Sequence, residues 1–111
     1  MTIHYHHASL AAGRWFTMTL AEQLGNVGSE VSRALKARGK DEQRFQNAIF
    51  RGLELLDLTI SDNRWRGRRK ELVRVRALLC DAYFGGTEYG TTLEGLDKYF
   101  YYFAFAARKN R

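Results

Sequence analysis

Four stretches of this chain repeat apolar residues at the three- and four-residue spacing of an α-helix, which limits the fold more than any other feature. The first stripe consists of Leu20, Leu24, Val27, Val31 and Leu35. The 111 residues include no proline, so nothing interrupts long helices. The stripes predict helices of about 18–20 residues joined by short connections. Short connections favour antiparallel neighbours, and we expect an all-α protein, an antiparallel up-down-up-down four-helix bundle.

Capping signals and glycines set the expected helix ends. Residues 19–22 and 91–94 both have the Thr-x-x-Glu pattern of a capping box, and Asp41 is a good N-cap for the second helix. Residues 1–18 show no clear helical period and are predicted to form an N-terminal arm, so that the bundle spans residues 19–111. We expect helices over residues 19–39, 41–61, 67–84 and from 91 onward.

Small residues follow one flank of the first predicted helix. They are Gly25, Gly28, Ser29 and Ser32. A glycine inside a helix costs about 1 kcal/mol relative to alanine. We therefore expect another backbone to approach this flank closely, either in the same subunit or in a neighbouring one.

The last predicted helix has aromatic side chains on every face. Six of the seven residues at positions 99–105 are aromatic, whereas a helix of one small bundle buries a single face. Aromatic residues are enriched at subunit interfaces, and large apolar patches are rare on monomers. We therefore predict a homo-oligomer with closed symmetry. Its expected interface residues, which include two from outside the main stripe of the second helix, are Phe50, Leu58, Tyr99, Tyr101, Tyr102 and Phe105.

The net charge of +6 is concentrated in one segment of the chain. Residues 64–76 contain seven basic residues and one acidic residue, while the remainder has equal numbers of both. Guanidinium and ammonium groups bind phosphates, and an aromatic ring beside them can stack on a base. We therefore predict that this segment binds DNA or RNA. The expected contact residues are Arg64, Trp65, Arg66, Arg68, Arg69, Lys70, Arg74 and Arg76.

Two other interpretations of this basic segment stay open. Trp65 could close one end of the bundle while the cations form a solvated helix face. Alternatively, the basic face could bind an acidic protein partner, because arginine is also enriched at protein interfaces. The protein would then be an interaction scaffold rather than a nucleic-acid-binding protein.

The sequence offers no convincing catalytic or metal site, so we expect a protein that is not an enzyme and has no cofactor. Cys80 has no histidine near it in sequence and fits a buried small residue. Glu54 and Asp57 could act as paired carboxylates, but ion pairs with Arg51 or with arginines of the third helix are the simpler expectation. The histidines, which fit a solvated arm better than a metal cluster, are His4, His6 and His7.

Several features predict a cytoplasmic location. The longest uncharged aromatic run, residues 99–107, is far shorter than the ~20 residues of a membrane span. The N-terminus lacks the basic flank and apolar stretch of a secretory signal. The single cysteine excludes a disulfide within one chain. We expect no membrane segment.

Three stretches of the chain resemble a family of small bacterial cytosolic proteins. They are LAEQLGNVGSEVSRAL, FQNAIFRGLELLDLTISDNRWRGRRKELVRVRALLCDAYFG and LDKYFYYFAFAAR. This family is related to proteins encoded in intervening sequences of large-subunit ribosomal RNA genes. It also includes the accessory variability determinant proteins of diversity-generating retroelements.

The resemblance implies a ring-like homo-oligomer, a homopentamer of four-helix bundles with a basic surface. In the retroelement members that surface is associated with nucleic acid and with a reverse transcriptase. The positions of this chain that match the basic surface are Arg64, Arg66, Arg68, Arg69, Lys70, Arg74 and Arg76.

Overall fold

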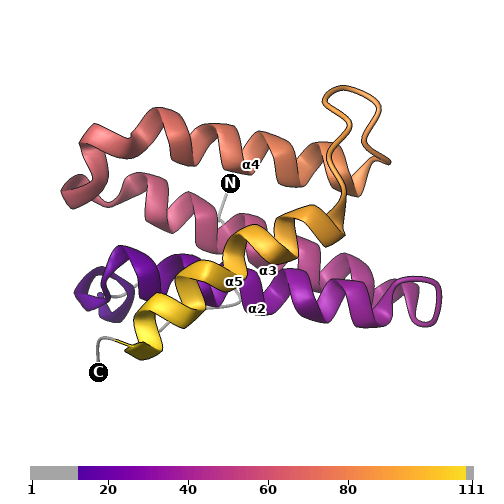
Figure 1. Ribbon diagram of the computed structural model, residues 1–111, viewed down its shortest axis with the longest axis horizontal. Helices are drawn as coiled ribbons and strands as arrows, with labels where there is room; N and C mark the ends of the chain where they lie inside the picture. Colours follow the sequence, from indigo (N-terminus) through magenta and orange to yellow (C-terminus); the bar gives the residue numbers. More distant parts are fainter. Residues whose placement is uncertain (1–12, 110–111) are drawn as a thin grey trace, which may run out of the picture.

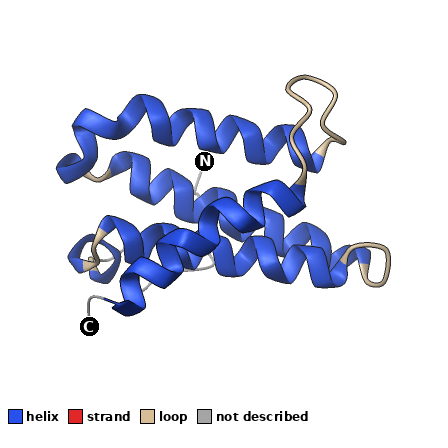
Figure 2. Cartoon of the chain, viewed as in Figure 1, coloured by secondary structure: helices blue, strands red, loops and turns tan. Residues whose placement is uncertain are grey.

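The computed structural model describes residues 13–109, and their regular structure is entirely helical (Figures 1 and 2). Two short 3-10 helices accompany four α-helices, and these described residues contain no strand. In chain order the elements are η1 (Arg14–Thr17), α2 (Leu20–Ala37), α3 (Glu42–Ser61), η2 (Asn63–Arg68), α4 (Arg69–Tyr83) and α5 (Leu93–Lys109). The predicted all-α class with four long helices is confirmed.

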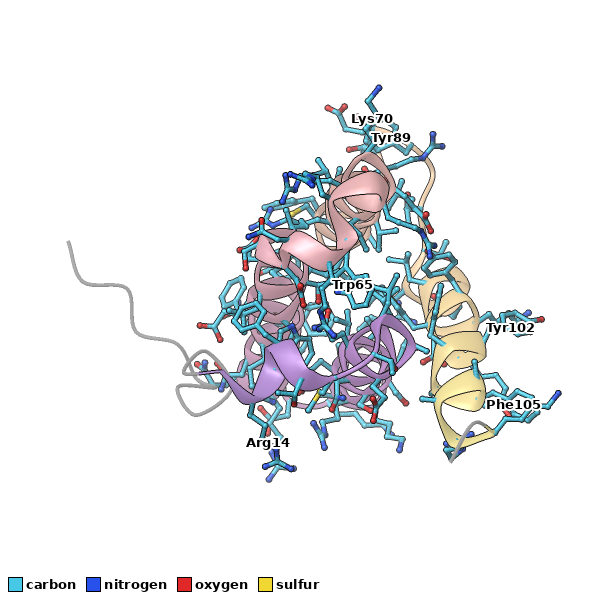
Figure 3. All side chains as sticks on the ribbon, turned by 90° about the vertical axis from the view of Figure 1, so that its left-hand side faces the viewer. Arg14, Trp65, Lys70, Tyr89, Tyr102 and Phe105 are labelled. Atoms are coloured by element: carbon cyan, nitrogen blue, oxygen red, sulfur yellow. The ribbon has the colours of Figure 1, made fainter. Side chains whose placement is uncertain are left out.

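Helix α2 is at the centre of the packing. It lies against α3 on one side and against α5 on another, while α4 packs mainly on α3. Figure 1 shows α5 crossing α2 obliquely, and the end view shows α5 standing apart from α4 (Figure 3). The apolar stripes meet in one core, whose most deeply buried side chains include Trp15, Leu24, Val27, Ile49, Leu56, Leu72, Leu79 and Phe100.

The predicted starts of the first two helices are confirmed. The Thr19 hydroxyl accepts a hydrogen bond from the Glu22 backbone N–H at 3.1 Å, and the Glu22 carboxylate accepts one from the Thr19 N–H at 2.9 Å. Gly39, just beyond the end of α2, has a φ of +77°, which glycine adopts without steric cost. Asp41 caps α3 by accepting a hydrogen bond from the Arg44 N–H at 3.1 Å.

The start of the fourth helix differs from the prediction by one residue. The hydroxyl of Thr92, rather than that of Thr91, accepts a hydrogen bond from the Gly95 N–H at 3.0 Å. The expected capping box is therefore replaced by a simple N-cap. Glu94 instead forms an ion pair with Arg38 beyond the end of α2, and this pair lowers the pKa of Glu94. The Thr91 N–H, which a capping box would have bonded to Glu94, donates to Asp81 at 3.2 Å.

The small residues on α2 allow α5 to pack closely. A Cβ atom placed on Gly28 would lie 2.6 Å from the Cβ of Phe100. One placed on Gly25 would lie 3.1 Å from the Cα of Ala104. The predicted close approach of another backbone therefore takes place within the subunit.

Near its C-terminal end, the segment predicted as the N-terminal arm forms η1, which packs onto the bundle. Trp15 has no exposed surface, and such a large indole contributes much of the apolar area in a small core. Residues 14–17 therefore belong to the folded domain rather than to a separate arm. The three histidines predicted to be in the arm, His4, His6 and His7, lie outside the described residues.

Candidate nucleic-acid interface

The predicted basic segment is divided between η2 and α4. Residues 63–68 form η2, so α4 begins at Arg69 rather than at Gly67 as expected. Asp57 and Asp62 precede the segment in sequence, but each forms an ion pair with one of its arginines. These pairs reduce the net positive charge that the segment can offer to a ligand. The three ion pairs are Arg64–Asp62 at 2.7 Å, Arg68–Glu71 at 2.9 Å and Arg76–Asp57 at 2.6 Å.

Trp65 takes part in a hydrogen-bond network inside the bundle. Its Nε1–H donates to the Oε1 of Gln23 at 2.9 Å, and Gln23 is completely buried. The Gln23 amide in turn donates to the Oδ2 of Asp62 at 3.1 Å and to the backbone oxygen of Trp15 at 2.9 Å. Figure 3 shows Trp65 in the middle of the end view, between the helices. This placement favours the interpretation that Trp65 closes the bundle, and we remove it from the predicted interface.

Arg64 is held by the same network. Its guanidinium donates to the Asp62 carboxylate at 2.7 Å and to the backbone oxygen of Met18 at 2.7 Å, and it lies 4.4 Å from the centre of the Trp65 ring. Hydrogen bonding from Arg64 lowers the pKa of Asp62, because donors to a carboxylate stabilise its charged form. Arg64 therefore joins η2 to the chain before α2, which is a structural role.

Arg69 and Arg76 also donate within the subunit. The half-buried Arg69 donates from Nε to the backbone oxygen of Ile60 at 3.2 Å. Arg76 donates to the Asp57 carboxylate, and this hydrogen bond raises the pKa of Arg76. Its Nη1 also lies 3.7 Å from the Sγ of Cys80. The predicted ion pair between Asp57 and an arginine of the third helix is confirmed, and it joins α3 to α4.

Three exposed cations of the segment form no ion pair among residues 13–109: Arg66, Lys70 and Arg74. Lys70 and Arg74 are four residues apart, so they lie on one row of α4, and Arg66 precedes them on η2. Lys70 and Arg74 border a groove of about 350 Å³ whose lining also includes Val73 and Tyr89. This groove brings unpaired positive charge and an aromatic ring together.

Tyr89 lies on the loop between α4 and α5, with 65% of its surface exposed. Figure 3, which looks along α4, shows Tyr89 and Lys70 on the same outer side of this helix, and both residues line the groove. Tyr89 is not among the contact residues predicted from the sequence, because it follows no helical period. The signal that could have found it is an aromatic residue in a glycine-rich turn, between Gly86 and Gly90.

The loop that carries Tyr89 is held by the buried carboxylate of Asp81. This carboxylate accepts backbone hydrogen bonds from Glu88 at 2.9 Å, from Tyr89 at 3.2 Å and from Thr91 at 3.2 Å. Burial opposes ionisation, but these N–H donors outweigh it and lower the pKa of Asp81. The backbone of Tyr89 is thus fixed beside the groove while its ring faces solvent.

Helix α5 presents three exposed aromatic side chains that were predicted to form an oligomer interface. Tyr101, Tyr102 and Phe105 expose 58%, 71% and 50% of their surface. Figure 3 shows Tyr102 and Phe105 pointing away from the bundle. Phe50 is also exposed, but it lies on α3 and contacts Tyr83 edge to face. The aromatic face, defined as Tyr101, Tyr102 and Phe105, is therefore a continuous feature of α5 alone.

Two other residues predicted for that interface are accommodated within the subunit. Leu58 is buried in the subunit's own core, so the argument that it needs a second subunit was wrong. Tyr99 is half-buried, and its hydroxyl donates to the Glu71 carboxylate at 3.4 Å. Its ring packs against those of Phe100 and Phe103. Leu58 lies on the face of α3, and Tyr99 on the face of α5, that is turned toward the rest of the bundle.

Residues 13–109 contain no group of three histidine, cysteine or acidic side chains that could hold a metal ion. Over the same part of the chain, every helix is too short or too polar to cross a membrane. No family model, curated protein or solved structure matches the chain. The family resemblance therefore stays a prediction from the sequence stretches, and the geometry around α4 is the basis for a functional proposal.

Proposed function

We propose that this protein is a non-enzymatic, homo-oligomeric protein that binds nucleic acid along α4. The observation that carries the proposal is that two unpaired cations, Lys70 and Arg74, line one groove with the exposed Tyr89, while a third, Arg66, precedes them on η2. The cations would contact backbone phosphates, and the ring would stack on a base. Stacking requires a base that is free of a partner strand, so single-stranded DNA or RNA is the favoured ligand.

The contact set that we propose is smaller than the one predicted from the sequence. Arg64, Trp65, Arg69 and Arg76 each donate at least one hydrogen bond within the subunit, so we leave them out of the proposed contact set. Arg68 is exposed but is shared with Glu71, and such an exposed pair contributes little to stability, so a phosphate could replace the carboxylate. The resemblance to the retroelement proteins extends the proposal to an accessory role beside a reverse transcriptase.

The proposal is tested by titrating labelled single-stranded and double-stranded DNA and RNA at two salt concentrations. Replacing Lys70 and Arg74 together with glutamine should weaken binding and reduce the slope of log K against log salt by about two, one unit for each phosphate contact. The matched control replaces two exposed cations of α5, Lys98 and Lys109, with glutamine, which makes the same change in net charge. This control should leave the slope of log K against log salt unchanged, because it keeps the cations of α4.

A third variant separates stacking from charge. Tyr89→Ala should lower affinity for single strands by roughly fivefold or more, because one base stacked on an aromatic ring contributes about 1–3 kcal/mol. Its affinity for a duplex should change little. Absence of salt-dependent binding to every nucleic acid would refute the proposal and leave an acidic protein partner as the better reading of this surface.

We further propose that the aromatic face of α5 joins copies of this chain into a closed ring. A hollow of about 260 Å³ adjoins the aromatic face; its lining includes Gly28, Ser32 and Tyr101. Protruding rings beside a hollow lined by small residues can form a head-to-tail contact, and such contacts close into a ring when the rotation permits. The number of five subunits comes from the family resemblance alone.

Light scattering behind a sizing column tests the ring. A mass close to that of one 12.9 kDa chain at micromolar concentration would contradict self-association. Serine at Tyr101, Tyr102 and Phe105 should convert the oligomer to monomers, since aromatic residues at the centre of an interface carry most of the association energy. Phe50→Ser, an exposed aromatic on α3, is the control and should leave the mass unchanged.

A further inference from the structure

A second cationic surface lies at the turn between α2 and α3. A hollow of about 470 Å³ is lined there by five basic residues, Arg33, Lys36, Lys40, Arg44 and Arg51, together with Ala37 and Asp41. Counting charge along the sequence hides this surface, because its cations are spread over two helices and interleaved with acidic residues. The fold brings the cations to one place, so the positive charge of the chain is not confined to residues 64–76.

A buried carboxylate organises two of the arginines. Glu30 is only 3% exposed, and it accepts hydrogen bonds from Arg33 at 2.9 Å and from Arg51 at 3.2 Å. One carboxylate therefore fixes two guanidinium groups that belong to different helices, α2 and α3. Each guanidinium has five N–H donors, so both arginines keep donors for a further anion after binding Glu30. Burying Glu30 would be costly without these partners.

The remaining cations surround the opening of the hollow. Lys36 and Lys40 are exposed and form no ion pair within the described part of the chain. The Arg44 side chain is 83% exposed. Within residues 13–109 its one ion pair is with the carboxylate of Asp41, at 3.3 Å. Glu30 and Asp41 together balance two of the five positive charges around the hollow. The potential inside it is therefore positive, and its lysines are free to move toward a ligand.

The lining also limits the chemistry of that ligand. It contains no aromatic ring on which a nucleobase could stack, and its one apolar residue is Ala37. The volume falls within the range of small-molecule sites, about 300–1,000 Å³. Guanidinium groups bind phosphate oxygens in pairs of hydrogen bonds, and lysine supplies a mobile charge. A compact anion with several charged oxygens fits all of these features.

We propose that this hollow binds a small phosphate ligand with at least two linked phosphoryl groups. The proposal is independent of the nucleic-acid interface, which lies on η2, α4 and the loop that carries Tyr89. Arg33 and Arg51, held by Glu30, form the rigid base of the site. Lys36, Lys40 and Arg44 close around the ligand from the exposed side.

Isothermal titration with inorganic pyrophosphate and tripolyphosphate tests the site, with sulfate at matched ionic strength as the comparison anion. We expect saturable binding of both phosphates and weaker binding of sulfate. Replacing Lys36 and Lys40 with glutamine should raise the Kd by roughly tenfold or more, because two charge-assisted contacts are lost. These side chains are exposed, so the variant should fold normally. The control with glutamine at Lys98 and Lys109 should bind like the original chain.

Further measurements separate this site from the interface on α4. Pyrophosphate should bind unchanged to the variant with glutamine at Lys70 and Arg74, even if that variant has lost nucleic-acid binding. Glu30→Gln, with folding checked by circular dichroism, should weaken binding by releasing both arginines. The proposal is overturned if neither phosphate binds, if the Lys98 and Lys109 control loses as much affinity as the site variant, or if an oligonucleotide displaces pyrophosphate competitively from the hollow.

Discussion

Replacing Gln23 with alanine should destabilise the fold more than a typical substitution of a polar residue. Gln23 is completely buried and makes three hydrogen bonds, two through its amide nitrogen and one through its oxygen. They connect the chain before α2, the end of α3 and the indole of Trp65. Because one amide binds all three of these elements, its loss affects all three at once.

The size of the effect follows from the groups that lose a partner. The part-buried Trp65 Nε1–H loses its acceptor, and a fully buried donor without a partner costs about 1–3 kcal/mol. The Trp15 oxygen keeps a second donor, the Met18 N–H at 3.2 Å, and Asp62 keeps Arg64, so these groups lose less. We therefore expect a loss of about 2–4 kcal/mol in the free energy of unfolding. Domains of this kind have roughly 5–15 kcal/mol in total.

Urea unfolding followed by circular dichroism measures this loss directly. Tryptophan fluorescence gives a local signal, because Trp15 and Trp65, the two tryptophans of the chain, both border the network. The matched control is Gln43→Ala, an exposed glutamine on α3 with one hydrogen bond to Asn47, which should change stability by less than about 0.5 kcal/mol. A loss for Gln23→Ala below about 1 kcal/mol, or equal to that of the control, would refute the structural role of the network.

Two further sets of variants test other parts of the structure. Arg64 lowers the pKa of Asp62, so the charged carboxylate stabilises the folded state. This stabilisation is complete above the ordinary pKa of 3.8 and is lost as the pH falls through the pKa of the folded state. The free energy of unfolding should therefore depend less on acidic pH for Asp62→Asn than for the original chain. Gly28→Ala should lower the free energy of unfolding by about 1–3 kcal/mol, because the new Cβ would collide with Phe100. Gly67→Ala places its Cβ in open space and should raise the free energy of unfolding by about 0.4–1 kcal/mol in the same urea assay.

The helices of this protein could be predicted because their signals are local. The apolar stripes, the capping box at Thr19 and the N-cap Asp41 each depend on residues within one or two turns of each other. These local signals gave wrong predictions where a residue far away in the sequence determined the structure. Glu94 left its expected capping box for Arg38, and Trp15 entered the core although its own segment has no period. No pattern within a short window contains that information.

The candidate site was harder to predict than the fold. Counting charge over residues 64–76 could not separate paired from unpaired cations. Asp57 lies 19 residues from Arg76, and only the packing of α3 on α4 brings them together. Tyr89 was missed for the opposite reason, since a single aromatic residue in a turn has no periodic neighbours. Its position depends on the backbone hydrogen bonds to Asp81.

Arginine serves two distinct purposes in this fold, and the position of the nearest carboxylate decides between them. Where an acid lies at a helix junction, as Asp62 does, the guanidinium becomes part of the framework and its donors are directed inward. Glu30 is equally buried, but it is shared by Arg33 and Arg51, and each of these arginines binds it through a single nitrogen, so each guanidinium is oriented without being saturated. An arginine held in this way loses less freedom when a ligand binds. A buried acid shared by two arginines is therefore a better guide to an anion site here than the number of cations in a segment.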